Sequence, residues 1–205
     1  MVQKSRNMIT SLDQLSMDGT YSYADYLTWR FEERVELIKG KIFKMSPAPS
    51  RWHQRASIVL SSAIFNFLEN KQFEIYTAPF DVRLIDSKKK KKKSNKEIYS
   101  VVQPDICVIC DPEKLDDRGC NGAPDWIIEI LSPGNNKKEV DNKFRLYEEN
   151  GVREYWVVYP SEQHVLVFDL GDEKYQLRKI YTGEDAAPVG IFSDFEINLQ
   201  EVFED

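Results

Sequence analysis

Apolar residues spaced three and four positions apart predict two long helices. The first spans residues 50–68 and starts at Ser50, a favourable N-cap, because its apolar residues share one helical face. They are Trp52, Ala56, Val59, Leu60, Ala63, Ile64, Phe67 and Leu68. The second spans residues 137–150 and ends before Gly151, a residue type that commonly closes helices. A shorter helix, capped by Ser22, is expected within residues 21–29.

Apolar runs bounded by proline, glycine and polar residues predict the strands. A hairpin is expected over residues 34–45, with Gly40 at its turn. Further strands are expected over residues 73–85, 98–110, 126–131, 152–159, 165–170 and 175–181. Helices and strands thus mix along the chain, which predicts a mixed α/β fold. We predict one domain over residues 21–205, preceded by a flexible leader over residues 1–20.

The composition is that of a globular protein rather than a disordered or membrane-spanning one. Of the 205 residues, 41% are hydrophobic and 12% are aromatic. No stretch approaches the roughly 20 apolar residues that a membrane-spanning helix needs. The amino terminus lacks the apolar core of a secretory signal, and the cysteines show no metal-binding spacing. We therefore expect a cytoplasmic protein with reduced thiols.

The net charge of -6 conceals a local excess of lysine. Six of the 28 basic residues form the run Lys88–Lys93, and outside it 22 basic residues face 34 acidic ones. Any surface that binds nucleic acid must therefore be local. The run is either a solvated charged loop or a phosphate-contacting segment, and its sequence leaves both interpretations open.

Two acidic residues lie in or beside strongly apolar predicted strands. Asp105 follows Pro104 at the start of one apolar run, and Glu129 lies inside another, Trp126–Leu131. An unpaired carboxylate is costly to bury, so each acid needs a partner or a raised pKa. One Mg²⁺ or Mn²⁺ ion would suit both carboxylates, with the Ile130 carbonyl as a further ligand. The alternatives are a turn residue for Asp105, and a solvent-facing residue or an arginine partner for Glu129.

Four more residues are candidates for the same site. Lys143 lies beside the apolar stripe of the second long helix, where its amine either reaches the Glu129 strand or extends along the core edge. Glu36, in the predicted hairpin, either completes the metal shell or is solvated. His53, in the first turn of the long helix, is a candidate substrate-binding residue or a boundary packing residue. Asp81 is a second choice, as another site acid or as the partner of an arginine.

In this order, the candidate residues resemble the signature of the PD-(D/E)XK nucleases: Pro104-Asp105, then Glu129 in a strand, then Lys143 on a helix. The flanking segments are similar to those of the Uma-type family of restriction endonucleases. These segments are Arg34 to Ile42, Met45 to Pro49 with His53-Gln54, Glu129 to Pro133, Lys143 with Tyr147, and Gly151 to Trp156. Each motif alone is weak, but their ordered series over about residues 21–200 is specific.

The resemblance implies a restriction-endonuclease-like core, with a central mixed β-sheet flanked by helices, and Mg²⁺-dependent cleavage of DNA. It makes Asp105 and Glu129 the metal ligands and Glu36 the acid of the first motif. The chain departs from the superfamily pattern at Leu131, because a lysine normally lies there, two residues after the acid. The family pattern moves this lysine to the next helix, where Lys143 matches it.

We therefore predict a metal-dependent endodeoxyribonuclease in which metal-activated water hydrolyses phosphodiester bonds. Lys143 would orient the water and stabilise the transition state, and a homodimer would suit cleavage of two strands. The alternative is a catalytically inactive nuclease-fold module that binds nucleic acid or a protein partner, which Leu131 and the acidic composition favour. A structural acid–base network without any nucleic-acid role is a third hypothesis. Convergence of the Lys143 amine with the two acids would support chemistry.

Overall fold

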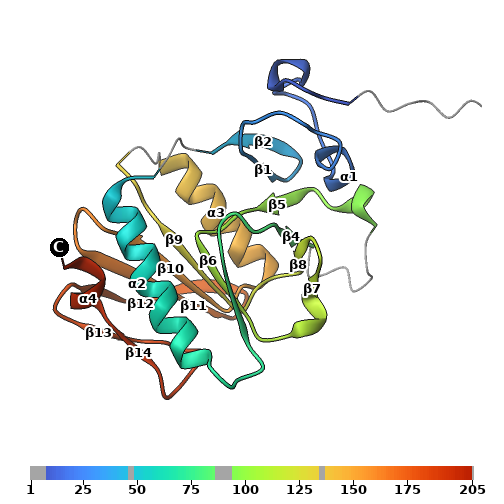
Figure 1. Ribbon diagram of the computed structural model, residues 1–205. Helices are drawn as coiled ribbons and strands as arrows, with labels where there is room; N and C mark the ends of the chain where they lie inside the picture. The colour runs from blue at the N-terminus through green and yellow to red at the C-terminus, as the bar shows by residue number, and fades with distance from the viewer. Residues whose placement is uncertain (1–7, 46–48, 86–93, 134–136, 205) are drawn as a thin grey trace, which may run out of the picture.

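The computed structural model of the chain describes residues 8–45, 49–85, 94–133 and 137–204. Its strands form two mixed six-stranded sheets and one two-stranded sheet, with two long helices packed against the strands (Figure 1). The helices are α1 (Tyr23–Tyr26), α2 (Arg51–Leu68), α3 (Lys137–Asn150) and α4 (Leu199–Phe203). Short 3-10 helices are η1 (Leu12–Gln14), η2 (Asn95–Glu97) and η3 (Pro112–Lys114). The two-stranded sheet pairs β13 (Ala186–Pro188) with β14 (Glu196–Asn198).

The first six-stranded sheet has the order β12-β11-β10-β9-β6-β3. Its strands are β3 (Glu74–Thr77), β6 (Ile106–Ile109), β9 (Trp126–Ile130), β10 (Glu154–Tyr159), β11 (His164–Gly171) and β12 (Lys174–Thr182). Strands β9 and β10 are parallel, and the other neighbours are antiparallel. Helix α3 connects β9 with β10, because parallel neighbours need a crossover connection. This connection brings α3 back across the strand that contains Glu129.

The second six-stranded sheet has the order β2-β1-β5-β4-β8-β7. Its strands are β1 (Val35–Ile38), β2 (Lys41–Lys44), β4 (Val82–Leu84), β5 (Ser100–Val102), β7 (Leu115–Asp116) and β8 (Gly119–Asn121). The β1–β2 hairpin turns at Lys39 and Gly40, whose φ angles are 51° and 80°. Positive φ at both central residues is what a tight two-residue hairpin turn requires. The predicted hairpin and its turn at Gly40 are therefore confirmed.

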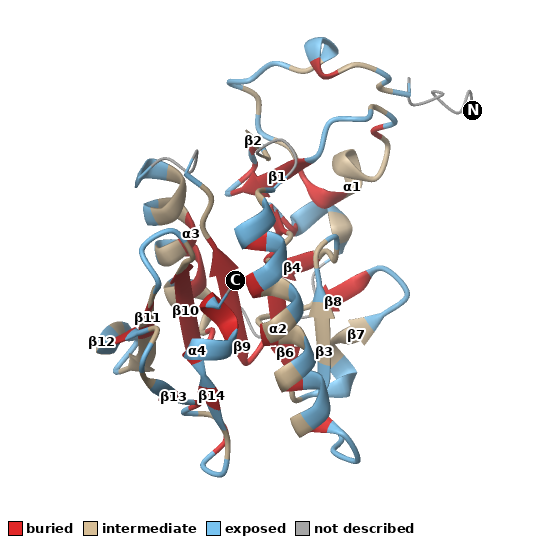
Figure 2. Cartoon of the chain, turned by 60° about the vertical axis from the view of Figure 1, so that its left-hand side comes forward, coloured by how far each residue is buried: buried red, intermediate tan, exposed pale blue. Residues whose placement is uncertain are grey.

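The alternation of side chains along β9 assigns its residues to two different cores. Trp126 and Ile128 belong to the core cluster that includes the apolar face of α2. Ile127 belongs to the cluster on the opposite face, which includes buried residues of α3. Figure 2 shows β9 and β10 as buried strands between these helices. By the same alternation, Glu129 points toward α3.

The predicted secondary structure is largely confirmed. Helix α2 begins after Ser50, whose hydroxyl accepts a hydrogen bond from the His53 N–H. Helix α3 and the strands at residues 154–159, 164–171 and 174–182 also lie where the sequence predicts them, whereas β13, β14 and α4 were not predicted. Helix α1 is shorter than expected and is capped by Ser22 and Asp25. The mixed α/β class is thus confirmed.

Two predicted strands differ from the structure, because each divides between the two large sheets. The segment 73–85 forms β3 and β4, and the segment 98–110 forms β5 and β6, so the expectation of two continuous strands was wrong. Pro79 and Pro104 lie in the two breaks, where a proline cannot donate to a strand ladder. The strands therefore form two mixed sheets, and the one that contains β9 is the expected mixed sheet with α2 on one face and α3 on the other.

Part of the predicted leader contacts the domain. Leu12 is 3% exposed and packs in a cluster with Tyr23 and Trp29. The division into a leader and a single domain stays a prediction, and the Lys88–Lys93 run lies outside the described residues. Within the described ranges, no helix combines the length and apolar character needed to cross a membrane.

Candidate active site

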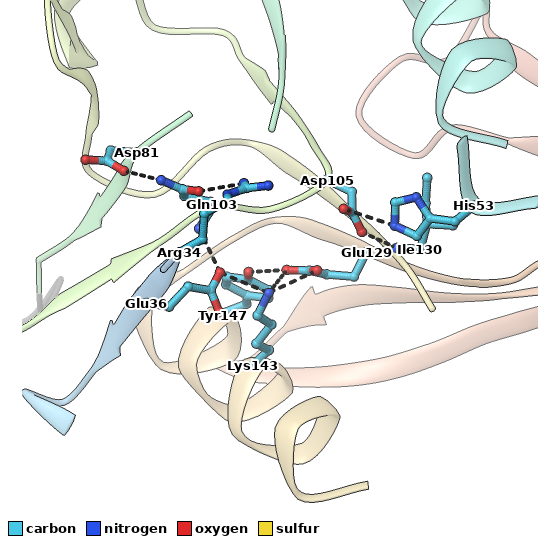
Figure 3. A network of polar contacts seen from close by, with 10 residues as sticks. All are labelled: Arg34, Glu36, His53, Asp81, Gln103, Asp105, Glu129, Ile130, Lys143 and Tyr147. Atoms are coloured by element: carbon cyan, nitrogen blue, oxygen red, sulfur yellow. Dashed lines mark hydrogen bonds and ion pairs between the residues drawn. The ribbon is translucent and has the colours of Figure 1, made fainter. Parts of the chain in front are cut away.

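Glu129, near the end of β9, is the centre of the candidate site. It is 6% exposed, and Lys143 Nζ donates to its Oε1 and Oε2 at 3.0 and 3.1 Å. The Tyr147 hydroxyl donates to Oε1 at 2.6 Å (Figure 3). Lys143 and Tyr147 are four residues apart on α3 and therefore lie on the same helical face. The helix that follows β9 thus supplies two donors to the buried acid of that strand.

Lys143 lies between two buried carboxylates. Its Nζ is 3.1 Å from Glu36 Oε1 on β1, and Glu36 is 3% exposed. The same Glu36 oxygen accepts a hydrogen bond of 2.8 Å from the backbone N–H of Gln103. Burial lowers the pKa of Lys143, but the charges of Glu129 and Glu36 outweigh it and raise that pKa above its ordinary value. Lys143 is therefore a permanently charged ammonium group.

The cluster has more carboxylates than cations, and this excess shifts Glu129. Burial raises the pKa of Glu129 to about 7, and the charges of Asp105 and Glu36 act in the same direction. Lys143 and the Tyr147 hydroxyl lower this pKa but only in part offset the burial. Near neutral pH, Glu129 is thus balanced between its protonated and charged forms, and an added cation would favour the charged form.

Asp105 lies immediately before β6, at the edge where β9 ends. The antiparallel register pairs Ile106 with Ile128, so Asp105 lies beside the end of β9 that contains the site glutamate. Its Oδ2 accepts a hydrogen bond of 2.7 Å from the Ile130 N–H. Its Oδ1 is 3.2 Å from His53 Nε2, in the first turn of α2. His53, a candidate for binding substrate, therefore faces Asp105 (Figure 3).

Asp81 is connected to this cluster through one intervening residue, Gln103. Its Oδ1 accepts a hydrogen bond of 2.9 Å from Gln103 Nε2, and Gln103 Oε1 accepts one of 2.7 Å from Arg34. Burial raises the pKa of Asp81, although hydrogen bonds from Gln103, Tyr23 and Tyr26 lower it in part. The backbone N–H of Gln103 binds a site glutamate, so Gln103 connects the two groups. The structure thus gives Asp81 its own set of partners.

Four of the predicted residues meet at one end of β9: Glu36, Asp105, Glu129 and Lys143. Tyr147 was not among the predicted site residues, although it touches Glu129 directly. Its spacing of four residues from Lys143 was the available signal, because that spacing aligns both side chains on α3.

The donor chemistry of the cluster fits a hard divalent cation. A carboxylate has about four acceptor positions, and Glu129 uses three of them while Asp105 uses two, so both retain acceptor capacity. Among the described residues, no group of three or more His, Cys, Asp or Glu side chains forms a complete set of metal ligands. Asp105 and Glu129 would therefore hold an ion together with water, as Mg²⁺ sites commonly do. The Ile130 carbonyl stays a predicted ligand.

Known proteins are similar to this chain in sequence and in fold. An uncharacterized protein of Synechocystis sp. (strain ATCC 27184 / PCC 6803 / Kazusa), slr1290, is 26% identical over 152 residues, covering 73% of this chain and 74% of that protein. A crystal structure described as "a putative nuclease belonging to DUF820", from Anabaena variabilis ATCC 29413, has the same fold. Its TM-score is 0.68 at 21% identity, covering 89% of this chain and 97% of that one.

A family model gives the broadest match. Residues 23–200 match the Uma2 family, described as "Putative restriction endonuclease". This description agrees with the resemblance found in the motifs, and it supports a nuclease function in general. Because the match extends over most of the sequence, the chain belongs to the Uma2 family.

Proposed function

We propose that the protein is a metal-dependent nuclease that hydrolyses phosphodiester bonds of DNA. One observation supports this most: Lys143 Nζ lies within 3.1 Å of both Glu36 and Glu129. The superfamily pattern expects a lysine at the position of Leu131, and an aliphatic side chain cannot donate a hydrogen bond. Lys143 brings the missing charge to the same acid from α3. The family description and the shared fold agree with nuclease chemistry.

Asp105 and Glu129 would hold the Mg²⁺ or Mn²⁺ ion. When bound, such an ion neutralises phosphate charge and lowers the pKa of a water ligand, so that hydroxide is available near neutral pH. The protein holds both carboxylates in place beforehand, because Tyr147 and Lys143 anchor Glu129 and the Ile130 N–H anchors Asp105. Such preorganisation keeps reacting groups within the narrow range of geometry that catalysis needs.

Lys143 would act through its charge and its N–H donors rather than as a base. Its raised pKa keeps the amine protonated at neutral pH, so it has no free electron pair with which to accept a proton. A fixed ammonium group in a buried site can orient the attacking water and stabilise charge that develops on the phosphate. Glu36 would assist by holding the lysine in position, since it accepts from Nζ at 3.1 Å.

The second candidate function is a catalytically inactive module that binds DNA or a protein partner. It is favoured by Leu131, and also by the fact that Lys143 contacts both oxygens of Glu129 and thereby neutralises it internally. Under this hypothesis the cluster is structural and binds no divalent ion. The preference for Mg²⁺ stays a prediction of the nuclease hypothesis. The homodimer and the cytoplasmic location stay predictions under both hypotheses.

Cleavage assays on duplex and single-stranded DNA with Mg²⁺ or Mn²⁺ test the proposal. We expect the wild-type protein to cut and Glu129→Ala to be inactive. Glu113→Ala, which removes an exposed acid of η3, is the matched control and should cut like the wild type. Equal cutting by the wild type and Glu129→Ala would point to a contaminating nuclease. A wild-type protein that binds DNA, but neither cuts it nor binds Mn²⁺, would support the inactive module.

A further inference from the structure

His53 has a specific place beside the candidate metal ligand. It lies in the first turn of α2, where its backbone N–H donates to Ser50 Oγ at 3.3 Å. Its side chain is nine-tenths buried, and Nε2 is 3.2 Å from Asp105 Oδ1. A carboxylate can only accept, so Nε2 is the donor in this contact. The imidazole is thus held by a packed helix and directed at one oxygen of one acid.

The other ring nitrogen, Nδ1, indicates that the contact of Nε2 with Asp105 is the main polar interaction of the His53 side chain. Nδ1 of His53 is buried and has no hydrogen-bond partner among the described residues. Leaving a polar atom in this state is unfavourable, so a residue with packing as its sole role would more readily be apolar. What the histidine adds at this position is the donor to Asp105.

Asp105 is held by two elements of the fold at once. Its Oδ2 accepts from the Ile130 N–H of β9, and its Oδ1 contacts His53 of α2. Two contacts on different oxygens fix the orientation of the carboxylate more firmly than the Ile130 contact alone would. Asp105 is also the more exposed of the two acids, its side chain being 22% exposed against 8% for Glu129. It therefore depends more on such a support.

We propose that His53 is a positioning residue, which orients Asp105 for binding the divalent ion and does not itself contact DNA. This inference rests on the proposed nuclease function. Side chains that orient metal ligands commonly contribute about 10- to 100-fold to metal affinity. His53→Ala should therefore weaken Mn²⁺ binding by about that factor. Because the defect lies in metal occupancy, raising the Mn²⁺ concentration should restore kcat.

The experiment compares three variants with the wild-type protein, using Mn²⁺ calorimetry, DNA cleavage at low and saturating Mn²⁺, and thermal unfolding. His53→Ala removes the donor. His53→Gln is the conservative variant, because its amide nitrogen can replace Nε2, and it should recover most of the Mn²⁺ affinity. His164→Ala changes the other histidine of the sequence, on β11, and should match the wild type throughout.

The outcomes separate this inference from the proposed function. Weak Mn²⁺ binding by His53→Ala, recovery by His53→Gln and rescue of kcat by Mn²⁺ would support positioning. A raised KM for DNA at saturating Mn²⁺ would show that His53 binds substrate and would overturn the inference alone. If the wild type is active and His53→Ala binds Mn²⁺ with the same affinity as the wild type, the inference is also overturned. A wild type that neither binds Mn²⁺ nor cuts DNA would overturn the proposed function and, with it, this inference.

Discussion

Two buried glutamates on the neighbouring strands β9 and β10 have different surroundings. Glu154, on β10, is 1% exposed and accepts hydrogen bonds from the Trp156 indole at 2.8 Å and the Ile191 N–H at 2.9 Å. Arg178 of β12 lies 3.2 Å away. These donors connect β10 with β12 and with the segment between β13 and β14. The carboxylate of Glu154 therefore has a structural role, because it links these segments of the fold.

Both glutamates share their cation, because Arg178 also pairs with the partly exposed Asp169. Glu129 is nearly as buried as Glu154. It shares Lys143 with Glu36, and Asp105 lies near enough to raise its pKa further. Burial of an acid therefore does not by itself indicate a functional site, because Glu154 is the more deeply buried of the two. The distinguishing feature is the larger excess of carboxylates: Glu36, Asp105 and Glu129 gather around the ammonium of Lys143, whereas Glu154 and Asp169 share Arg178. The larger excess leaves room for an added positive charge.

Removal of Lys143 should have the largest effect on stability. Lys143→Met leaves Glu36 and Glu129 buried without a cation, which should reduce the free energy of unfolding by about 3–5 kcal/mol. Urea denaturation measures the loss. The control is Lys39→Met. It removes an exposed lysine of the β1–β2 turn that pairs with Glu149 of α3, and it should reduce the free energy of unfolding by about 0–1 kcal/mol. Equal losses in the two variants would contradict the buried-cluster interpretation.

Glutamine substitutions should change the two buried acids in opposite directions. Glu154→Gln should lower the free energy of unfolding by roughly 1–3 kcal/mol, because its amide group cannot satisfy every donor now held by the carboxylate. Glu129→Gln should raise it at pH 8 by on the order of 2 kcal/mol, since it removes a charge whose burial is unfavourable. Parallel urea titrations at pH 8 check both signs. Destabilisation by both variants would show that Glu129, like Glu154, stabilises the fold.

The stability of the protein should depend on pH through Glu129. The folded-state pKa of about 7 lies above the ordinary value of 4.5, so the folded protein binds more protons between these values. The contribution is therefore complete below about pH 4.5 and is lost as the pH rises through about 7, with a slope of at most about 1.4 kcal/mol per pH unit. Subtracting the stability of Glu129→Gln from that of the wild type at each pH isolates it. A constant difference from pH 4 to 8 would refute the raised pKa.

The smallest of these effects should come from the Tyr147 hydroxyl. Tyr147→Phe keeps the ring packing but removes one donor to Glu129, at a cost of about 1 kcal/mol. Because this hydroxyl lowers the pKa of Glu129, its loss should move the pH-dependent transition to higher pH. Tyr175→Phe is the control: it removes a hydroxyl that donates to the Val152 carbonyl and should leave the transition in place. A shift in both variants would point to a general change in packing.

The sequence predicted the parts of the fold and site that follow from local periodicity. Helical spacing placed Lys143 on the shoulder of α3, and the apolar neighbours of Glu129 indicated a central strand; the structure joins the two at 3.0 Å. The division of strands at Pro79 and Pro104 was not predicted, because it depends on how each half pairs across the sheets. The partner of His53 likewise depends on how α2 packs against the sheet near Asp105, which no local pattern encodes.

Calorimetric titration of Mn²⁺ at pH 7, repeated in buffers of different ionisation enthalpy, tests the central claim most directly. It counts the protons released as the metal binds. Burial raises the pKa of Glu129 to about 7, so this group is partly protonated at this pH and the wild type should release a fraction of a proton from it as the ion binds. Glu154→Gln should behave like the wild type, and Glu129→Gln should bind Mn²⁺ far more weakly. Absence of Mn²⁺ binding by the wild type, or equal binding by Glu129→Gln, would contradict the assignment of the cluster as a metal site.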